Sequence, residues 1–440
     1  MAGQSGLAPL RGASLAVIAA ALLSGCTGAT LTGAEATSAA QRPGQELLVA
    51  KDERKVDGSA VIADLAARRS IIPAGSSYDR IARAVIAADT GGARAELRVK
   101  QLQAEARSKN WLPSLGPAVS LTSLGSLATS LLLDQAMFDS GRRKAEREYT
   151  VADVEVAAVN LSLDGNRRVH QALTLYVDAE AARGRAAVAG NALERLAEFD
   201  RIMTARVQGG VSNMSEQTVL RQKLIEMQAA LQADRDKATL AASELDAMAG
   251  VPVSGSAGLT QLPPGMPPVQ PLAVHLAEAE KERTVAELKM ARAGYMPGVA
   301  ASSNLLGGGG IGVSGSIGNG LRPGRAATLE AVAAGADAAA ARVAQAGQDA
   351  ARRRQALEMR IANLDRQEAA QKDIAVQTRA NLKRFEDQYK AGVRPLMDLV
   401  SQHESLAAME RDLVDMHHDR ARARLDIARD MGLLADGAGL

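Results

Sequence analysis

The chain carries the same construction twice, and this repeat is the feature that most constrains its fold. In each copy an apolar turn with a proline precedes two short strand-like runs and a glycine-arginine step. A long helical run, a glycine-valine turn and a second helix follow. The matching landmarks are Trp111 and Tyr295, Gly141 and Gly324, and Gly210 and Gly392, offset by 184, 183 and 182 positions. Because an internal repeat decides architecture before any local pattern does, we expect strand hairpins at one end and long helical hairpins at the other.

The composition favours helices packed side by side over a large globular core. Aromatic residues make up 2% of the 440 residues, and a large core normally depends on them. Alanine is abundant, which allows close helix packing, although a compositional bias of the source genome would also produce it. The net charge of +2 gives no reason to expect a nucleic-acid partner.

The first residues have the pattern of an export signal. Arg11 ends a short basic region, and the apolar run that follows it is about ten residues long, too short to span a bilayer as a helix. The run ends in Leu23-Ser24-Gly25-Cys26, which looks like a bacterial lipobox, and Cys26 is the only cysteine. We predict that Cys26 carries lipid. A cleaved signal with an incidental cysteine is the alternative.

Proline and glycine positions divide the remaining chain into segments. We expect a signal peptide at 1–25, an N-terminal extension at 26–77, a first repeat at 78–250, a proline-rich linker at 251–271, a second repeat at 272–432 and a tail at 433–440. The first repeat is predicted to begin with a helix from about Tyr78 to Lys109.

Each repeat is predicted to contain one very long helix. No proline occurs between Gly141 and Gly210, so a helix of roughly 100 Å fits there, and the second copy matches it from about Gly324 to Tyr389. The helix after each turn follows a heptad pattern, in which Asp234 and Ala241 fill gaps. The two strand-like runs of the first copy are each about ten residues long, which is the length of a membrane-spanning strand.

The motifs give no support for an enzyme, a cofactor or a metal site. The sequence from Gly310 to Gly315 matches G-x-G-x-x-G but lies in a predicted strand hairpin, whereas a dinucleotide site needs a helix to open there. His403 and His417 share a helical face about 21 Å apart, too far for one metal ion. No nucleophile, base and acid set is evident, so we predict a protein that is not an enzyme.

The paired copies behind a lipobox resemble the TolC-like outer-membrane factors, from about Tyr78 to Gly432. The resemblance implies a mainly α fold with a small β part, made of two strand-strand-long helix-helix repeats. In that family three subunits form a tunnel of helices on a twelve-stranded β-barrel, and the short helices stack end to end beside each long one. It also implies an outer-membrane, lipid-anchored homotrimer with a large periplasmic part, which works with a periplasmic adaptor protein and an inner-membrane transporter. The threonine that follows Cys26 fits outer-membrane sorting by the same kind of resemblance.

The resemblance is most specific at the second helical turn. Family members carry a tyrosine three residues before the turn glycine, an arginine two after it and an aspartate six after it. The residues at those spacings here are Tyr389, Gly392, Arg394 and Asp398. A second family aspartate is replaced by Ser401. At the first turn, the acid six residues after Gly210 is Glu216. The resemblance implies that Arg394 and Tyr389 tether a neighbouring hairpin through Glu216 and hold the tunnel end shut. Ordinary solvated charges are the alternative for each of them.

These patterns lead to an exit duct for efflux or type I secretion as the predicted function. The alternatives are a periplasmic adaptor and a structural coiled-coil lipoprotein without a pore. Two hairpin copies with strands only at their far ends argue against an adaptor. One departure from the pattern of barrel proteins is the scarcity of aromatic residues near the strand ends, where only Trp111, Phe138 and Tyr295 occur.

Overall fold

The computed structural model describes residues 59–123, 126–255, 258–263, 265–304, 311–317 and 324–437. The predicted signal peptide and Cys26 lie outside these residues. Within them, no helix combines the length and the apolar character needed to cross a membrane.

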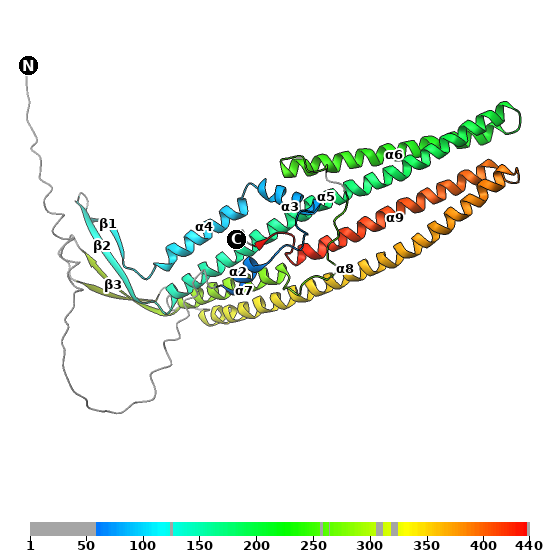
Figure 1. Ribbon diagram of the computed structural model, residues 1–440. Coiled ribbons are helices and arrows are strands. Elements are labelled where there is room, and N and C mark those ends of the chain that lie inside the picture. Colours follow the sequence, from blue (N-terminus) through cyan, green and yellow to red (C-terminus); the bar gives the residue numbers. More distant parts are fainter. Residues whose placement is uncertain are drawn as a thin grey trace, which may run out of the picture. The chain divides into compact units, whose positions relative to one another are not determined.

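Two long helical hairpins dominate the fold, as the repeat predicts (Figure 1). The first consists of α5 (Arg142–Gln208) and α6 (Met214–Ala249), and the second of α8 (Arg325–Lys390) and α9 (Leu396–Asp430). With 67 and 66 residues, α5 and α8 each run for roughly 100 Å. Both hairpins turn at the end opposite the strands.

Two shorter helices, α4 (Gly92–Ser108) and α7 (Leu272–Ala293), extend the rows formed by α6 and α9 beside the long helices. Along α5, α4 precedes α6. On the other side of α5, α7 precedes α9, and both of them also pack on α8. The long helix α5 is therefore covered on two sides, whereas α8 is covered on one.

Burial follows this order of helices. Many side chains of α5 are buried, including Val169, Leu173 and Tyr176. Few of the described side chains of α8 are buried. The buried apolar ones include Ala339, Ala375 and Leu382. Small residues allow the close approach of α5 and α9. A Cβ atom added to Gly184 would stand 2.8 Å from a methyl group of Val414.

The predicted helix from Tyr78 to Lys109 is wrong in one respect, because it is two helices. The first, α3 (Ser77–Ala87), ends before Gly91, which has a φ of 73°, and α4 begins at Gly92. This left-handed conformation is accessible to glycine without strain, and it redirects the chain. The sequence Asp-Thr-Gly-Gly at positions 89–92 could have indicated this break between the helices.

The structure adds a helix that the sequence analysis did not predict. Within the expected extension, α2 (Ala60–Ala67) packs on α5 through the buried side chain of Leu65. Arg68 then donates hydrogen bonds to the carbonyls of Met431 (2.6 Å) and Gln270 (2.8 Å). In the expected tail, Leu433 and Leu434 are buried. Both ends of the described chain are therefore fixed to the helical core.

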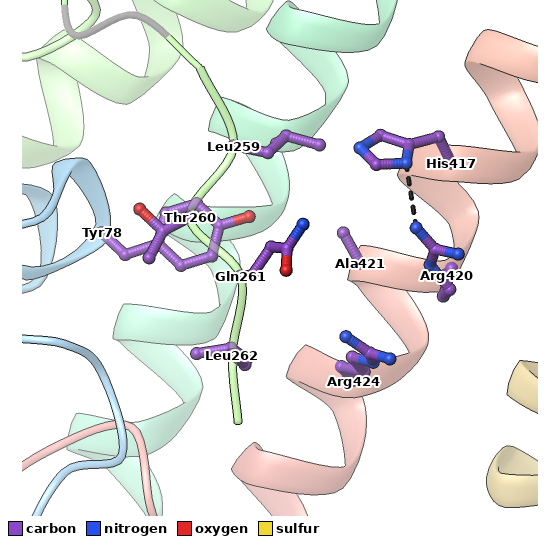
Figure 2. A pocket seen from close by; sticks show the side chains of 9 residues that line it. All are labelled: Tyr78, Leu259, Thr260, Gln261, Leu262, His417, Arg420, Ala421 and Arg424. Carbon is purple, nitrogen blue, oxygen red and sulfur yellow. Dashed lines mark hydrogen bonds between the residues drawn. The ribbon is translucent and has the colours of Figure 1, made fainter. Parts of the chain in front are cut away.

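The proline-rich linker is held between helices as an extended segment. Leu259 to Leu262 pass between Tyr78 of α3 and the α9 residues His417 to Arg424, around a cavity of about 250 Å³ (Figure 2). Leu262 is buried in the same apolar cluster as Tyr78. In this cavity Arg420 already pairs with Asp365 and Glu368 of α8 at 2.7 Å each.

The four described strands form one antiparallel sheet in chain order. They are β1 (Ser114–Ser123), β2 (Ser126–Phe138), β3 (Pro297–Asn304) and β4 (Gly312–Ile317). The pairing of β2 with β3 joins the two repeats, with Asp134 opposite Ser302. Within the described part of the chain, β1 and β4 are edge strands, each paired on one side only.

Candidate functional site at the helical turns

The two hairpin turns have the same geometry, which explains the repeated glycine. In the first, the amide of Val211 donates to the carbonyl of Arg206 (2.8 Å), and that of Gly210 to the carbonyl of Val207 (3.0 Å). In the second, the amide of Val393 bonds to Gln388 and that of Gly392 to Tyr389 in the same way. This double bond pattern is a Schellman motif, which needs a left-handed residue after the helix. Gly210 and Gly392 supply it, with φ of 70° and 74°.

The second turn gathers the charged residues that the sequence analysis selected. The Arg394 guanidinium lies 3.9 Å from the centre of the Phe385 ring. It also donates to Gln388 (2.5 Å) and pairs with Asp398 (3.3 Å). Asp398 is in the first turn of α9, where the helix dipole favours a carboxylate. Within one chain, Arg394 thus contacts its own hairpin.

The predicted partner acid stands apart from this group. The structure records no ion pair or side-chain hydrogen bond of Glu216 among the described residues, and it does not bring Glu216 to Arg394 within one chain. Ser401, which replaces the second aspartate, is exposed and bonds to the carbonyl of Met397 in its own helix. The predicted tether joins Arg394 and Tyr389 of one copy to Glu216 of another, so a single chain does not test it.

A pair that the sequence analysis missed connects the two turns. The guanidinium of Arg206, in the last turn of α5, lies 5.9 Å from the centre of the Tyr389 ring at the end of α8. A cation within about 6 Å of an aromatic ring is attracted by about 0.5–1 kcal/mol at exposed sites. The sequence offered no signal for this pair, because its members lie 183 positions apart and in different hairpins.

Next to the turns, an apolar cluster binds the two hairpins together. Its buried members come from all four long-hairpin helices and are Leu196, Phe199, Met203, Leu220, Leu382, Leu396, Leu399 and Val400. His403 lies beside Phe199, with ring centres 5.1 Å apart. Its Nε2 atom is 3.6 Å from Glu386, too far for a hydrogen bond, and burial lowers the pKa of His403.

Farther from the turns, a buried ion network joins three helices. Asp234 of α6 is 2% exposed, and its two carboxylate oxygens accept from Arg185 of α5 (2.9 Å) and Arg411 of α9 (2.7 Å). Arg185 also pairs with Asp415 of α9. Arg185 and Asp415 adjoin Gly184 and Val414, so the network lies where α5 and α9 approach closely. Asp234, which fills a gap in the heptad pattern, therefore takes part in linking the two hairpins.

The remaining sequence motifs carry no chemistry at this site. Gly312 and Gly315 lie in β4, away from the start of any described helix. Among the described residues, no group of histidine, cysteine, aspartate or glutamate has the arrangement of a metal site.

Comparison with known proteins identifies the fold. No protein-family model matches the chain, and neither does any curated protein. Solved structures do match, among them the outer membrane protein VceC of Vibrio cholerae. It is 15% identical, with a TM-score of 0.71 over 81% of this chain and 96% of that one.

Two further structures give the same result. A membrane protein from Pseudomonas aeruginosa is 18% identical, with a TM-score of 0.71 over 82% of this chain and 91% of that one. The open state of the MtrE outer membrane channel of Neisseria gonorrhoeae is 17% identical, with a TM-score of 0.64 over 84% and 94%. The chain has the fold of the TolC-like outer-membrane factors. The resemblance seen in the sequence is confirmed at the level of the fold.

Replacing Asp234 should weaken the structure strongly. In Asp234→Ala, Arg185 and Arg411 would face each other without their shared acid. Removing one member of a buried ion pair costs about 3–5 kcal/mol, and the partial exposure of both arginines places the loss near the lower value. Chemical denaturation of the purified protein measures it. Asp236→Ala, an exposed aspartate of the same helix, should change stability by less than about 0.5 kcal/mol. Equal denaturation midpoints for the two variants would contradict the assigned role.

Proposed function

We propose that this protein is an outer-membrane exit duct, through which substrate passes from the periplasm to the exterior without being chemically changed. The observation that carries the proposal is a channel fold whose sheet has two open edges. In a bilayer, unpaired backbone groups on β1 and β4 would each cost several kcal/mol. Three copies that pair β4 with the next β1 would close a twelve-stranded barrel and remove the edges.

The helical part supports the same assembly. α6 exposes Val219, Ile225 and Leu240, and α8 exposes Met359, Ile374 and Val376. Packing α8 of one copy against α6 of the next would cover part of each set of side chains. Repeated around a three-fold axis, this contact closes a ring and leaves a channel on the axis. A homotrimer is therefore the proposed state.

The proposed partners follow from the two ends of the molecule. At the turns, Val211 and Val393 occupy matching positions and are both exposed, which suits docking of a periplasmic adaptor protein. The adaptor would connect the duct to an inner-membrane transporter that supplies the energy, for efflux or for type I secretion. The strands would lie in outer-membrane lipid.

Planar-bilayer recording tests the proposed function. The purified protein should need detergent, show three-fold particles by electron microscopy and form stable channels when added to a bilayer. A soluble monomer without conductance would refute the duct. It would favour a structural coiled-coil lipoprotein instead.

The turn residues are proposed as the gate, and variants of them should change conductance. Three copies of Asp398 near the axis would attract cations, so Asp398→Ala should move the cation-to-anion permeability ratio toward one. If Arg394 and Tyr389 tether a neighbouring hairpin through Glu216, then Arg394→Ala and Glu216→Ala should raise single-channel conductance. Asp373→Ala, an exposed acid farther along α8, serves as the control. Parent-like behaviour of all three gate variants would rule out the gate, even if the duct is correct.

Lipid on Cys26 is proposed as a second attachment to the membrane. Each buried methylene group contributes about 0.8 kcal/mol, so several acyl chains on one residue would hold the N-terminus firmly. The variant Cys26→Ser should lose incorporation of labelled palmitate while still assembling in part, since the barrel remains. Unchanged labelling would show that the cysteine is incidental.

A further inference from the structure

A cavity of about 440 Å³ lies where the strands meet the helices, at the opposite end from the turns, and basic side chains line it. Its walls come from α4, β2, the start of α5, the end of α7 and β3. Arg107, Arg142 and Arg143 contribute the positive charges, and Asp139 and Glu146 are the acids. The formal charge of the lining is therefore positive by one.

Both acids are already engaged. The Asp139 carboxylate caps α5 by accepting from the backbone amides of Gly141 (3.1 Å) and Arg143 (2.8 Å). Glu146 accepts from the side chains of Arg142 and Asn110 at 3.2 Å each, and it also forms an ion pair with Arg107 at 3.8 Å. Neither acid is left to neutralise a further cation.

Of the three arginines that line the cavity, Arg143 is the one without an ion-pair partner among the described residues. Among the described residues its guanidinium makes no ion pair, and its Nη1 atom is buried without a hydrogen bond. A buried donor left unpaired costs about 1–3 kcal/mol, and more for a charged group. The cavity thus offers a positive group that an anion from outside the chain would satisfy.

The start of α5 adds to the positive potential. Arg142, Arg143 and Lys144 follow one another there, and the first turn contains no acid. The N-terminus of a helix carries a partial positive charge of its own, and here the Asp139 carboxylate partly offsets it together with the three successive cations. The second repeat also begins its long helix with an arginine, Arg325, and without an acid in the first turn.

Exposed apolar side chains adjoin the cavity on the side of the strands. Trp111 and Leu112 follow Asn110, and Met137 and Phe138 precede Asp139. All four are exposed, Trp111 to 60% and Met137 to 69%. Tryptophan favours the boundary between hydrocarbon and headgroups, where arginine can reach phosphate. Met137 and Phe138 come shortly before Arg142 and Arg143 in the chain, and this order of apolar and then basic side chains fits that boundary.

We propose that this cavity binds the phosphate of an anionic phospholipid headgroup through Arg107, Arg142 and Arg143. The inference rests on the proposed function, since it requires the sheet to lie in a bilayer. A volume of about 440 Å³ is within the usual size of small-ligand sites. The bound lipid would fix the depth of the sheet and the direction in which α5 leaves the membrane.

Trp111 provides a local reporter, because it is the only tryptophan of the chain. Delipidated full-length protein in neutral detergent is titrated with brominated phosphatidylglycerol or brominated phosphatidylcholine, and quenching of tryptophan fluorescence is recorded. The parent should be half-quenched at a lower concentration of phosphatidylglycerol than of phosphatidylcholine. In the triple variant Arg107→Gln, Arg142→Gln, Arg143→Gln, that concentration for phosphatidylglycerol should rise by about fivefold per arginine removed.

The matched control removes three charges elsewhere. Arg352, Arg353 and Arg354 follow one another in α8, and the triple glutamine variant there should be quenched as the parent is. Circular dichroism and particle symmetry check that both triple variants assemble. Quenching of the cavity variant at the parent's concentration would overturn the inference.

Two further outcomes separate the sources of failure. If inorganic phosphate without lipid raises the melting temperature of the parent as much as phosphatidylglycerol does, the site takes free phosphate and the lipid assignment is wrong. If both lipids quench the fluorescence and the arginine variants do not change this, the phosphate site is refuted and the proposed function is not. A parent that no lipid quenches and that needs no detergent would refute the proposed function as well.

Discussion

The burial of α5 on two sides is the constraint on which the rest of the fold depends. The helices α4 and α6 cover one side, and α7 and α9 cover the other, so α5 holds both repeats together. This arrangement requires a long helix without proline and with small residues at the closest approaches, such as Gly184 against Val414. The second long helix, α8, has one covered side. Within a single chain, one side of α8 therefore stays uncovered.

The repeat in the sequence predicted the architecture because each of its landmarks has a physical cause. Gly210 and Gly392 recur because both turns need a left-handed residue, and a long proline-free segment permits a long helix. The parts that were missed depend on contacts outside the local sequence. The helix α2 has no core of its own, since Leu65 is buried against α5 and its neighbours. The break at Gly91 was overlooked because helical periodicity continues on both sides of it.

The candidate sites show the same division between local and distant causes. The resemblance to the family at the turn around Gly392 pointed to Tyr389, Arg394 and Asp398, and the structure places Arg394 beside Asp398. In the sequence, Asp234 only fills a gap in a heptad pattern. Nothing in its own helix indicates that Arg185 of α5 and Arg411 of α9 donate to it. The glycine-arginine step at Arg142 was visible in the sequence. The cavity that Arg142 lines was not, because it also needs Arg107 from α4.

The contacts between the two hairpins differ in kind and in strength along their length. At the turns, the Arg206–Tyr389 contact joins the two hairpins and contributes about 0.5–1 kcal/mol. The apolar cluster behind them is non-directional, so its side chains can slide while they remain in contact. The Asp234 network is buried and directional, and it joins the hairpins through Arg411 on Asp234 and through the pair of Arg185 with Asp415. Between the turns and this network, Lys223 of α6 pairs with Glu404 of α9 at 2.6 Å. If the hairpins separate, they part most easily at the turns, because the polar links that resist separation begin at Lys223 and continue at Asp234.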